Sequence, residues 1–285
     1  SLYALDAETG AVAWSATPGG GSGSTWTTPA YADGVLYLGS NDYAVHAIDA
    51  ADGSEIWRYS TNANVRSAPA VVNGVVYVGS NDGNVTALNA TTGERLWYHR
   101  LSPLALVESN PAVVDGTVYF GAGDNNVTAL DAETGERVWN FETPDQVQSE
   151  PTVADGTGFV GSDSTAGESS GYGLIHALDA ADGTEEWSHT VVGDVDGGLV
   201  YADGTVYGGS RGGDLVALDA ATGDEVWNHI GADFRGAPVV ADGVVYVSDF
   251  GLSTVHAFDA DTGSELWTYD SPSSSLYPTP LVWDG

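Results

Sequence analysis

Lysine and cysteine are absent from this 285-residue chain, and arginine is scarce. Seven arginines face 40 acidic residues, which gives a formal net charge of −33 at pH 7. A surface of this charge repels the phosphate backbone, so we expect no nucleic-acid partner. The lack of cysteine by itself is compatible with either a reducing cytosol or an oxidising exterior.

The chain also lacks amphipathic stretches of helical period, which predicts an all-β protein. There is no glycine-rich G-x-G-x-x-G turn opening a helix and no G-x-S-x-G nucleophile elbow before a helix. Neither a signal peptide nor a long apolar run is visible, so we expect no direct membrane insertion by this segment, although it begins in the middle of a repeat.

What the chain does contain is repetition. The pattern A-x-[DN]-A-x-[TD]-G-x-x-x-W occurs seven times, and its tryptophans are Trp14, Trp57, Trp97, Trp139, Trp187, Trp227 and Trp267. Their spacing of about 40 residues matches the length of a four-stranded propeller blade. The repeat fills the sequence, so residues 1–285 are expected to form a single domain.

Each repeat contains four short apolar or alternating segments, designated strands A to D. In the second repeat they span residues 67–72, 75–80, 84–90 and 94–100. An Asp-Gly or Asn-Gly pair separates strands A and B, and such pairs suit type I′ hairpin turns. Four strands bury too little apolar area by themselves, so the repeats are expected to stack as antiparallel blades of a closed β-propeller.

With seven copies of an eleven-residue motif, the sequence resembles the PQQ-like β-propeller repeat family, named for pyrroloquinoline quinone. The resemblance implies that each strand-D tryptophan docks on the glycine of a neighbouring motif, for example Trp57 on Gly93. It also implies one of two kinds of protein. Quinoprotein dehydrogenases hold the quinone with calcium, usually under a disulfide between adjacent cysteines, whereas other members are non-catalytic scaffolds such as the outer-membrane barrel assembly lipoprotein.

The missing cysteines favour the scaffold group. The segment "GDVDGG" (193–198) is interpreted as an acidic loop rather than a set of calcium ligands. We therefore expect no catalytic residues, no cofactor and no metal, and a non-enzymatic function. A PQQ-dependent oxidoreductase, or a fragment of one, is the alternative.

Histidine offers no clear catalytic group. His46, His176 and His256 occupy the place in strand C that Thr86 and Thr128 fill in other repeats. A position that alternates between histidine and threonine is interpreted as part of a sheet face.

The acidic residues are spread over every repeat. A protein that sequesters cations or binds basic partners would be expected to gather them in one run instead. Such self-repulsion destabilises a compact state unless salt screens it, so the composition is typical of an extreme halophile, in particular a haloarchaeon. Three N-x-[ST] sequons and the family resemblance favour an extracellular or cell-surface location; they begin at Asn84, Asn89 and Asn126.

The ends of the sequence predict how the ring closes. The first residues form strands C and D of a blade, and residues 279–285 form strand A with its hairpin turn. Seven blades are therefore expected, with the closing blade shared between the two ends and its strand B missing. An eight-bladed ring in a longer parent chain is the alternative.

Loop lengths distinguish the two faces of the predicted disc. The interval from the motif alanine to its tryptophan is ten in all seven copies, whereas the D-to-A interval varies from 11 to 15 and one B-to-C connection carries an insertion at 162–173. Because strands in a blade are antiparallel, the D-to-A and B-to-C connections lie on one face. We expect this loop face to bind, since binding residues concentrate on loops held by a rigid scaffold. The alternative is that length variation there is merely tolerated.

The candidate site is the position three residues before the strand-A proline, which holds six residue types in seven copies: Trp26, Arg66, Glu108, Gln148, Asp196, Arg235 and Tyr277. Two arginines and two aromatic residues suit an anionic or sugar-like ligand. In the alternative, Arg66 pairs with Glu108 and Arg235 with Asp196 merely to neutralise a crowded axis. The expected function is thus a binding scaffold whose partner is a protein, a glycan or a small molecule.

Overall fold

The computed structural model describes residues 1–21, 27–102, 105–163, 171–231, 233–272, 279–280 and 282. They form two compact units. The first comprises residues 1–124 and 128–138, and the second comprises residues 125–127 and 139–285.

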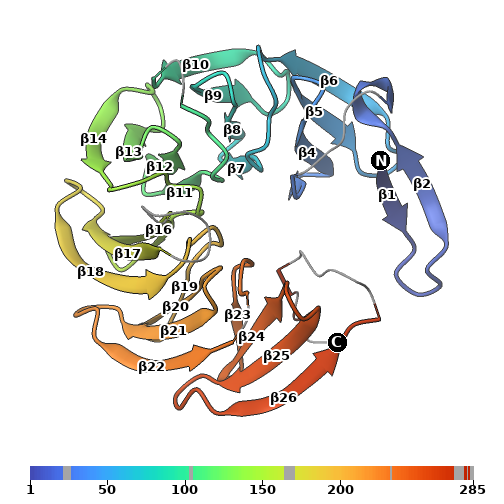
Figure 1. The fold of residues 1–285 in the computed structure, drawn as a ribbon. Helices are drawn as coiled ribbons and strands as arrows, with labels where there is room; N and C mark the ends of the chain where they lie inside the picture. The colour runs from blue at the N-terminus through green and yellow to red at the C-terminus, as the bar shows by residue number, and fades with distance from the viewer. Residues whose placement is uncertain are drawn as a thin grey trace. The chain divides into compact units, whose positions relative to one another are not determined.

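The first unit begins with a two-stranded sheet, followed by two four-stranded sheets (Figure 1). Their strands are β1 (Leu2–Leu5) and β2 (Val12–Ala16); β3 (Ala30–Ala32), β4 (Val35–Ser40), β5 (Ala44–Asp49) and β6 (Glu55–Ser60); and β7 (Ala70–Val72), β8 (Val75–Gly79), β9 (Asn84–Asn89) and β10 (Arg95–Arg100). The next sheet is divided between the units; its strands are β11 (Ala112–Val114), β12 (Thr117–Ala122), β13 (Asn126–Asp131) and β14 (Arg137–Glu142).

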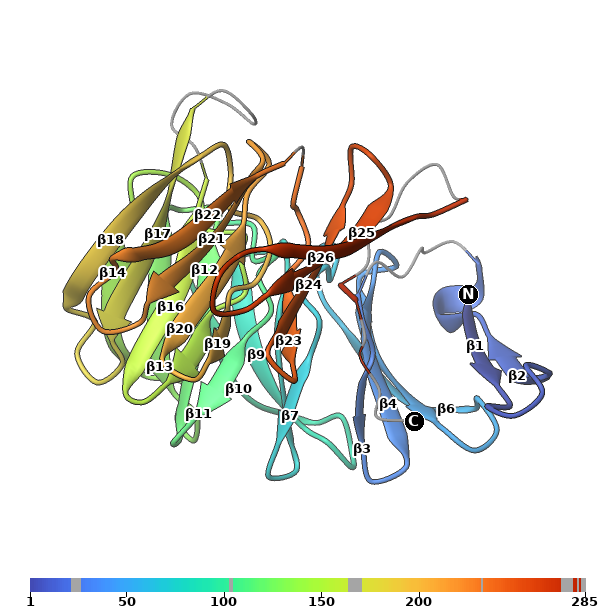
Figure 2. The same ribbon diagram turned by 90° about the horizontal axis from the view of Figure 1, so that it is seen from below.

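The second unit contains three further four-stranded sheets. Their strands are β15 (Thr152–Ala154), β16 (Thr157–Ser162), β17 (Tyr172–Asp179) and β18 (Glu185–Val192); β19 (Val200–Ala202), β20 (Thr205–Gly209), β21 (Asp214–Asp219) and β22 (Glu225–Ile230); and β23 (Val239–Ala241), β24 (Val244–Asp249), β25 (Thr254–Asp259) and β26 (Glu265–Asp270). The two longest strands, β17 and β18, have eight residues each (Figure 2).

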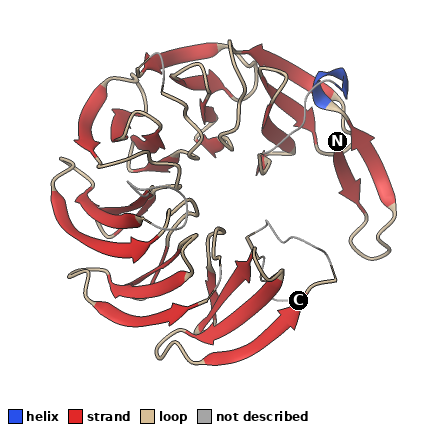
Figure 3. Cartoon of the chain, viewed as in Figure 1, coloured by secondary structure: helices blue, strands red, loops and turns tan. Residues whose placement is uncertain are grey.

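Strands dominate the described part of the chain, as the sequence predicts (Figure 3). Within those residues the only helix is the short 3₁₀ helix η1 (Pro18–Gly21). No helix in the described ranges is long and apolar enough to cross a membrane.

Local backbone chemistry sets the A-to-B hairpins. Asn73 and Gly74 have φ values of 51° and 77°, so both central residues of the turn are left-handed, as a type I′ turn requires. The five Asp-Gly pairs at the other A-to-B hairpins of the described chain repeat this geometry, at Asp33, Asp115, Asp155, Asp203 and Asp242. The predicted type I′ turns are confirmed.

Strand A is shorter than predicted. In the second repeat the sheet begins at Ala70, whereas residues 67–72 were expected to be extended and paired. Pro69 has no N–H to donate, and the Ser67 hydroxyl instead accepts a hydrogen bond from Gly79 N at 3.2 Å. The segment before the proline is therefore held by a side chain rather than by a β-ladder.

The small residues of strand A allow these strands to converge. In the first unit β3 contacts β7 and β7 contacts β11, and in the second unit β15 contacts β19 and β19 contacts β23. Strand D lies at the opposite edge of each complete sheet. Within each unit, strand A is thus the inner strand and strand D the outer one.

Tryptophan joins successive sheets. Trp57 Nε1 donates a hydrogen bond to Ala90 O at 2.8 Å, and a Cβ added to Gly93 would lie 2.7 Å from the indole ring. This is the pairing expected from the sequence, and it recurs for Trp14, Trp97, Trp139, Trp187 and Trp227. Trp267 in β26 differs, since 47% of its surface is exposed.

The core lies between adjacent sheets. One cluster in the first unit joins Trp97 with Phe120 and Leu130, and one in the second joins Trp227 with Phe234 and Phe258. The segment 279–285, expected to supply strand A of the closing blade, falls mostly outside the described residues. Closure with seven blades, or with eight in a longer parent, therefore stays a prediction.

Candidate functional site

Each of the five predicted site residues that the structure describes follows a buried apolar side chain, here called the anchor. Val65, Val107, Val147, Val195 and Phe234 are the anchors, and each is at most 1% exposed. Val107 packs where a Cβ on Gly79 of the preceding sheet would stand. Glycine in strand B therefore makes room for the anchor, which fixes the start of the D-to-A connection.

A buried serine fixes the other side of the site residue in three of the sheets. Ser109 Oγ donates to Gly121 O at 2.9 Å and accepts from Gly121 N at 2.8 Å. Ser149 makes the same two bonds with Gly161, at 2.8 and 2.7 Å. The residue between anchor and serine takes no part in these serine–glycine bonds, so its side chain can differ between repeats without disturbing the fold.

In the first unit, this arrangement brings Arg66 and Glu108 together. Arg66 NH1 lies 3.0 Å from Glu108 Oε1, and the Asn81 amide donates to the same oxygen at 2.8 Å. The two charged side chains are 42% and 24% exposed. The neutralising pair considered from the sequence is confirmed here, and Asn81 is an additional member of the site.

In the second unit, two site residues bind the B-to-C connection of their own sheet. The Gln148 amide donates to Asp163 Oδ2 at 2.8 Å. Asp196 accepts a hydrogen bond from Arg211 Nε, and Arg211 NH1 also lies 3.7 Å from Asp194 Oδ2.

Arg235 makes a bidentate contact with Asp233. Its Nε lies 2.8 and 2.9 Å from the two carboxylate oxygens, and its guanidinium carbon lies 4.4 Å from the centre of the Phe250 ring. The expected partner was Asp196, on which Arg235 acts at longer range by lowering the pKa of that carboxyl group. A neighbour in the same loop thus supplies the close contact.

These contacts share one sequence spacing, from which they could have been predicted. Residues 15 apart meet in 148–163, 196–211 and 235–250, and residues 66 and 81 share Glu108. The first member precedes strand A and the second follows strand B. Both loops therefore lie together in each unit, as predicted for the loop face. Trp26 and Tyr277 lie outside the described residues.

Burial perturbs the acids of the second unit. The pKa of Asp163 is raised to about 7, mainly by burial and also by the negative charges of Asp196 and Asp194, while the Gln148 hydrogen bond and Arg211 oppose the rise. Burial also raises the pKa of Asp196, against the stabilising charge of Arg211. Asp163 is therefore partly protonated near neutral pH.

The histidines of strand C contact glutamates of strand D in the same sheet. His46 Nδ1 lies 2.7 Å from Glu55 Oε2 and its Nε2 lies 3.1 Å from Asp42 Oδ1, with the ring fully buried. The same histidine-to-glutamate contact occurs for His176 with Glu185 at 2.8 Å and for His256 with Glu265 at 2.9 Å. This pairing supports the structural interpretation of the position.

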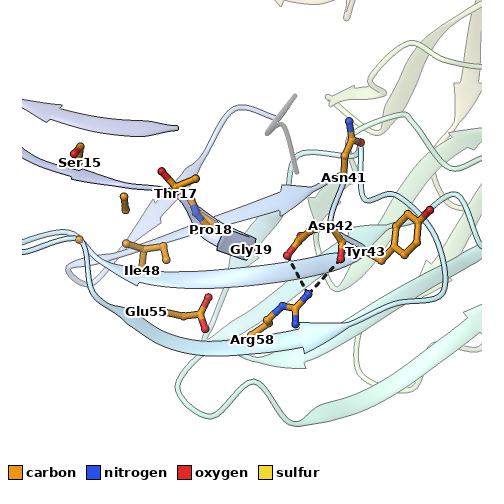
Figure 4. A pocket seen from close by; sticks show the side chains of 12 residues that line it. Ser15, Thr17, Pro18, Gly19, Asn41, Asp42, Tyr43, Ile48, Glu55 and Arg58 are labelled. Carbon is orange, nitrogen blue, oxygen red and sulfur yellow. Dashed lines mark hydrogen bonds and ion pairs between the residues drawn. The ribbon is translucent and has the colours of Figure 1, made fainter. Parts of the chain in front are cut away.

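A cleft of about 770 Å³ lies in the first unit (Figure 4). Its lining includes Asp42 and Glu55, the two carboxylates that contact His46. β2 and η1 form one wall and the sheet β3–β6 forms the other. The arginine in the cleft, Arg58, is paired with Asp42 Oδ2 at 3.0 Å and also donates to Asp42 O at 3.2 Å. Its positive charge therefore neutralises a buried carboxylate of the cleft wall.

Histidine and carboxylate side chains do not gather as metal ligands in the described ranges. No group of three or more histidine, aspartate or glutamate side chains there is arranged to hold a metal ion. In the "GDVDGG" loop, Asp194 and Asp196 face Arg211 instead. These residues do not fit the calcium site of a quinoprotein.

Comparison with known proteins is consistent with the repeat architecture. The family model described as outer membrane protein assembly factor BamB matches residues 1–163 and 171–280. No curated protein sequence matches the chain.

Among solved structures, BamB from Moraxella catarrhalis is similar with a TM-score of 0.72 and 22% identity, over 86% of this chain and 76% of that one. The computationally designed Ika8 protein is similar with a TM-score of 0.57 and 18% identity, over 92% of each chain. Identities this low show the fold, which is an all-β propeller of four-stranded antiparallel blades. By the match over most of its length, the chain belongs to the PQQ-like repeat family described as outer membrane protein assembly factor BamB.

Proposed function

We propose that this protein is a non-catalytic interaction scaffold that binds a protein partner through its loop face. The observation that carries the proposal is the anchored position before strand A. Buried side chains at 65, 107, 147, 195 and 234 hold the loops, while the residue after each anchor varies among arginine, glutamate, glutamine and aspartate in the described copies. A rigid frame that presents variable polar side chains is suited to specific recognition.

The charges on the loop face favour a protein partner over a small anion. Arg66 shares its charge with Glu108, and Arg235 with Asp233, so neither guanidinium is left for an isolated anion. Paired, partly exposed charges instead provide donors and acceptors at the rim of a protein interface, where they set specificity more than affinity.

The family supports the same role. Its description names a factor in outer membrane protein assembly, which is an interaction between proteins. We also propose an extracytoplasmic, cell-surface location and a salt-rich environment for this chain. The composition supports the salt-rich environment, since a net charge of −33 requires screening by ions.

The test is comparative capture. The intact chain is immobilised in high salt, exposed to detergent-solubilised envelope proteins of the source cell, and compared with the double variant Arg66→Ala/Arg235→Ala. We expect a partner that the parent retains and the double variant loses. Circular dichroism should show an unchanged fold, because partly exposed pairs contribute only about 0–1 kcal/mol.

Variants on the opposite face provide the control. Thr92→Arg and Glu133→Arg place charge on exposed C-to-D turns and should retain the same partner. A partner that is lost with these turn variants, or retained by the double variant, contradicts the assignment of the loop face. Turnover of a quinone-dependent substrate by the parent would contradict the non-catalytic role.

A further inference from the structure

A groove in the first unit lies between the sheets β3–β6 and β7–β10, where β6 and β10 are neighbours (Figure 1). Its volume is about 240 Å³, and its lining is polar and aromatic. One wall comes from the end of β6 and the following loop, and the other comes from β9, β10 and the loop before β9.

The ladder between β9 and β10 determines which side chains face this groove. Tyr98 pairs with Thr86 and Arg100 with Asn84, so these four side chains share one face. Trp97 points to the other side, toward Gly135. The register shift between Arg95 and Trp97 brings Arg95 to the groove side, where its guanidinium carbon lies 4.6 Å from the centre of the Tyr98 ring.

The two arginines of the groove, Arg95 and Arg100, differ from four of the other five in the chain. Arg58, Arg66, Arg211 and Arg235 each pair with an aspartate or glutamate. Among the described residues, no carboxylate pairs with Arg95 or Arg100; Arg95 instead donates to the Tyr59 hydroxyl at 3.3 Å. In a chain with 40 acids and seven arginines, two neighbouring cations without a carboxylate are available to an external anion.

The aspartate that lines the groove, Asp82, already accepts hydrogen bonds from neighbouring residues. Asp82 accepts hydrogen bonds from Asn84 Nδ2 at 2.8 Å, from Asn62 N at 3.0 Å and from the Ser80 hydroxyl. These bonds keep its pKa below the ordinary value in spite of burial, so the group stays ionised. It adds a fixed negative charge to the groove without neutralising either arginine.

The repeats show that the arrangement is particular to this blade. The place of Arg95 is occupied by glutamate in four other complete blades and by Arg137 in the remaining one. The place of Arg100 is filled elsewhere by Ser60, Glu142, Thr190, Ile230 and Asp270. β10 is thus the only one of these D strands with both arginines.

We infer that this groove binds a sugar that carries a single carboxylate, such as a uronic acid residue. The carboxylate would lie against Arg100 and Arg95, whose guanidinium groups match its planar geometry. Hydroxyl and amide groups of Ser60, Thr61 and Asn62 line the facing wall and suit the hydroxyls of a sugar ring. The exposed Tyr98 ring offers an apolar surface beside them.

Charge and size narrow the ligand class. A dianion such as phosphate would meet the ionised Asp82 and the large negative field of the chain, so a monoanion is favoured. The volume is below the roughly 300–1,000 Å³ of sites for drug-sized molecules, so the groove suits about one sugar ring. This inference does not depend on the proposed protein partner, because its residues are separate from Arg66 and Arg235.

The test is a calorimetric titration of the intact chain with D-glucuronate, at a constant KCl concentration that keeps the protein folded. D-glucose, acetate and glucose 6-phosphate are titrated in parallel. We expect saturable binding of glucuronate at one site, with the other three compounds weaker. Arg100→Ala should weaken glucuronate binding about tenfold or more, the usual effect of losing a charge-assisted hydrogen bond.

Arg137→Ala is the matched control, because Arg137 occupies the place of Arg95 in the next blade and lies outside the groove. It should bind glucuronate as the parent does, and both variants should keep the parent melting temperature. The inference is wrong if glucuronate fails to bind the parent at high-millimolar concentration or binds Arg100→Ala equally well. It is also wrong if glucose, acetate or glucose 6-phosphate binds as tightly as glucuronate.

Discussion

Asp163 illustrates how position decides the protonation of a single carboxyl group. In two C-to-D turns, hydrogen bonds from the following residues lower the pKa of Asp131 and Asp259. Asp163 follows strand B and is half-buried beside Asp196, and its Oδ1 accepts no hydrogen bond from the described residues. The same kind of side chain is therefore ionised in one loop and partly protonated near neutral pH in another.

Replacing Asp163 by asparagine should change how stability depends on pH. The pKa is about 7 in the folded state and about 3.9 in the unfolded chain, so folding takes up a proton between these values. The contribution of Asp163 to stability therefore falls as pH rises from about 4 to 7. Asparagine does not titrate, so the Asp163→Asn variant does not lose stability in this way as pH rises. It should therefore be more stable than the parent at pH 8, and the difference in stability should shrink toward pH 4.

Melting temperatures of the two proteins, measured at constant high salt across that pH range, check this prediction. All other acids are common to both chains, so the difference between the curves reports on position 163. Parallel curves would show that Asp163 titrates normally.

At the scale of the element, glycine has two different reasons to occupy a left-handed turn. Gly74, in an A-to-B hairpin, has φ of 77° and open space where a Cβ would stand. Gly93, in a C-to-D turn, has φ of 71°, but a Cβ there would lie 2.7 Å from the Trp57 ring. The first turn needs only the backbone freedom of glycine, whereas the second also needs its lack of a side chain.

The matched substitutions Gly74→Ala and Gly93→Ala separate these effects. Gly74→Ala should lower the free energy of unfolding by about 1–2 kcal/mol, the cost of a left-handed alanine. Gly93→Ala should lower it by about a further 1–3 kcal/mol, because the Trp57 ring must move. Denaturant titration measures both. Equal losses would mean that the indole ring yields freely and that the docking contact adds little to stability.

At the scale of the whole molecule, charge sets the conditions under which the fold persists. Forty acids against seven arginines repel one another over the surface, and the arginine pairs at 58, 66, 211 and 235 neutralise only a few of them. Screening by salt removes this repulsion, since the Debye length falls to about 3 Å at 1 M. The fold is therefore expected to depend on its solvent.

Thermal unfolding should move to higher temperature as KCl or NaCl is raised from about 0.1 to about 2 M, because added ions screen the acidic surface. Melting curves followed by circular dichroism in each salt check this. A melting temperature that stays flat over the range would overturn the halophilic interpretation.

The sequence by itself determined the repeating parts of this protein. The Asn73-Gly74 turn follows from the sequence, and the docking of Trp57 on Gly93 follows from the family resemblance that the repeated motif carries. Each depends on a residue's own backbone preference or on a contact that the repeat copies in every blade. Such local rules are readable because the same letters recur at the same spacing.

Only the tertiary structure decided the parts that differ between blades. Arg211 binds Asp196, Arg235 binds Asp233, and Asn81 joins Arg66 at Glu108. The groove of Arg95 and Arg100 likewise needs Tyr59 from the preceding sheet. Neither β-strand periodicity nor turn chemistry encodes these contacts, because each depends on the distance between loops from different strands and on side-chain reach. That distance is set when the sheets pack on their tryptophans and anchors.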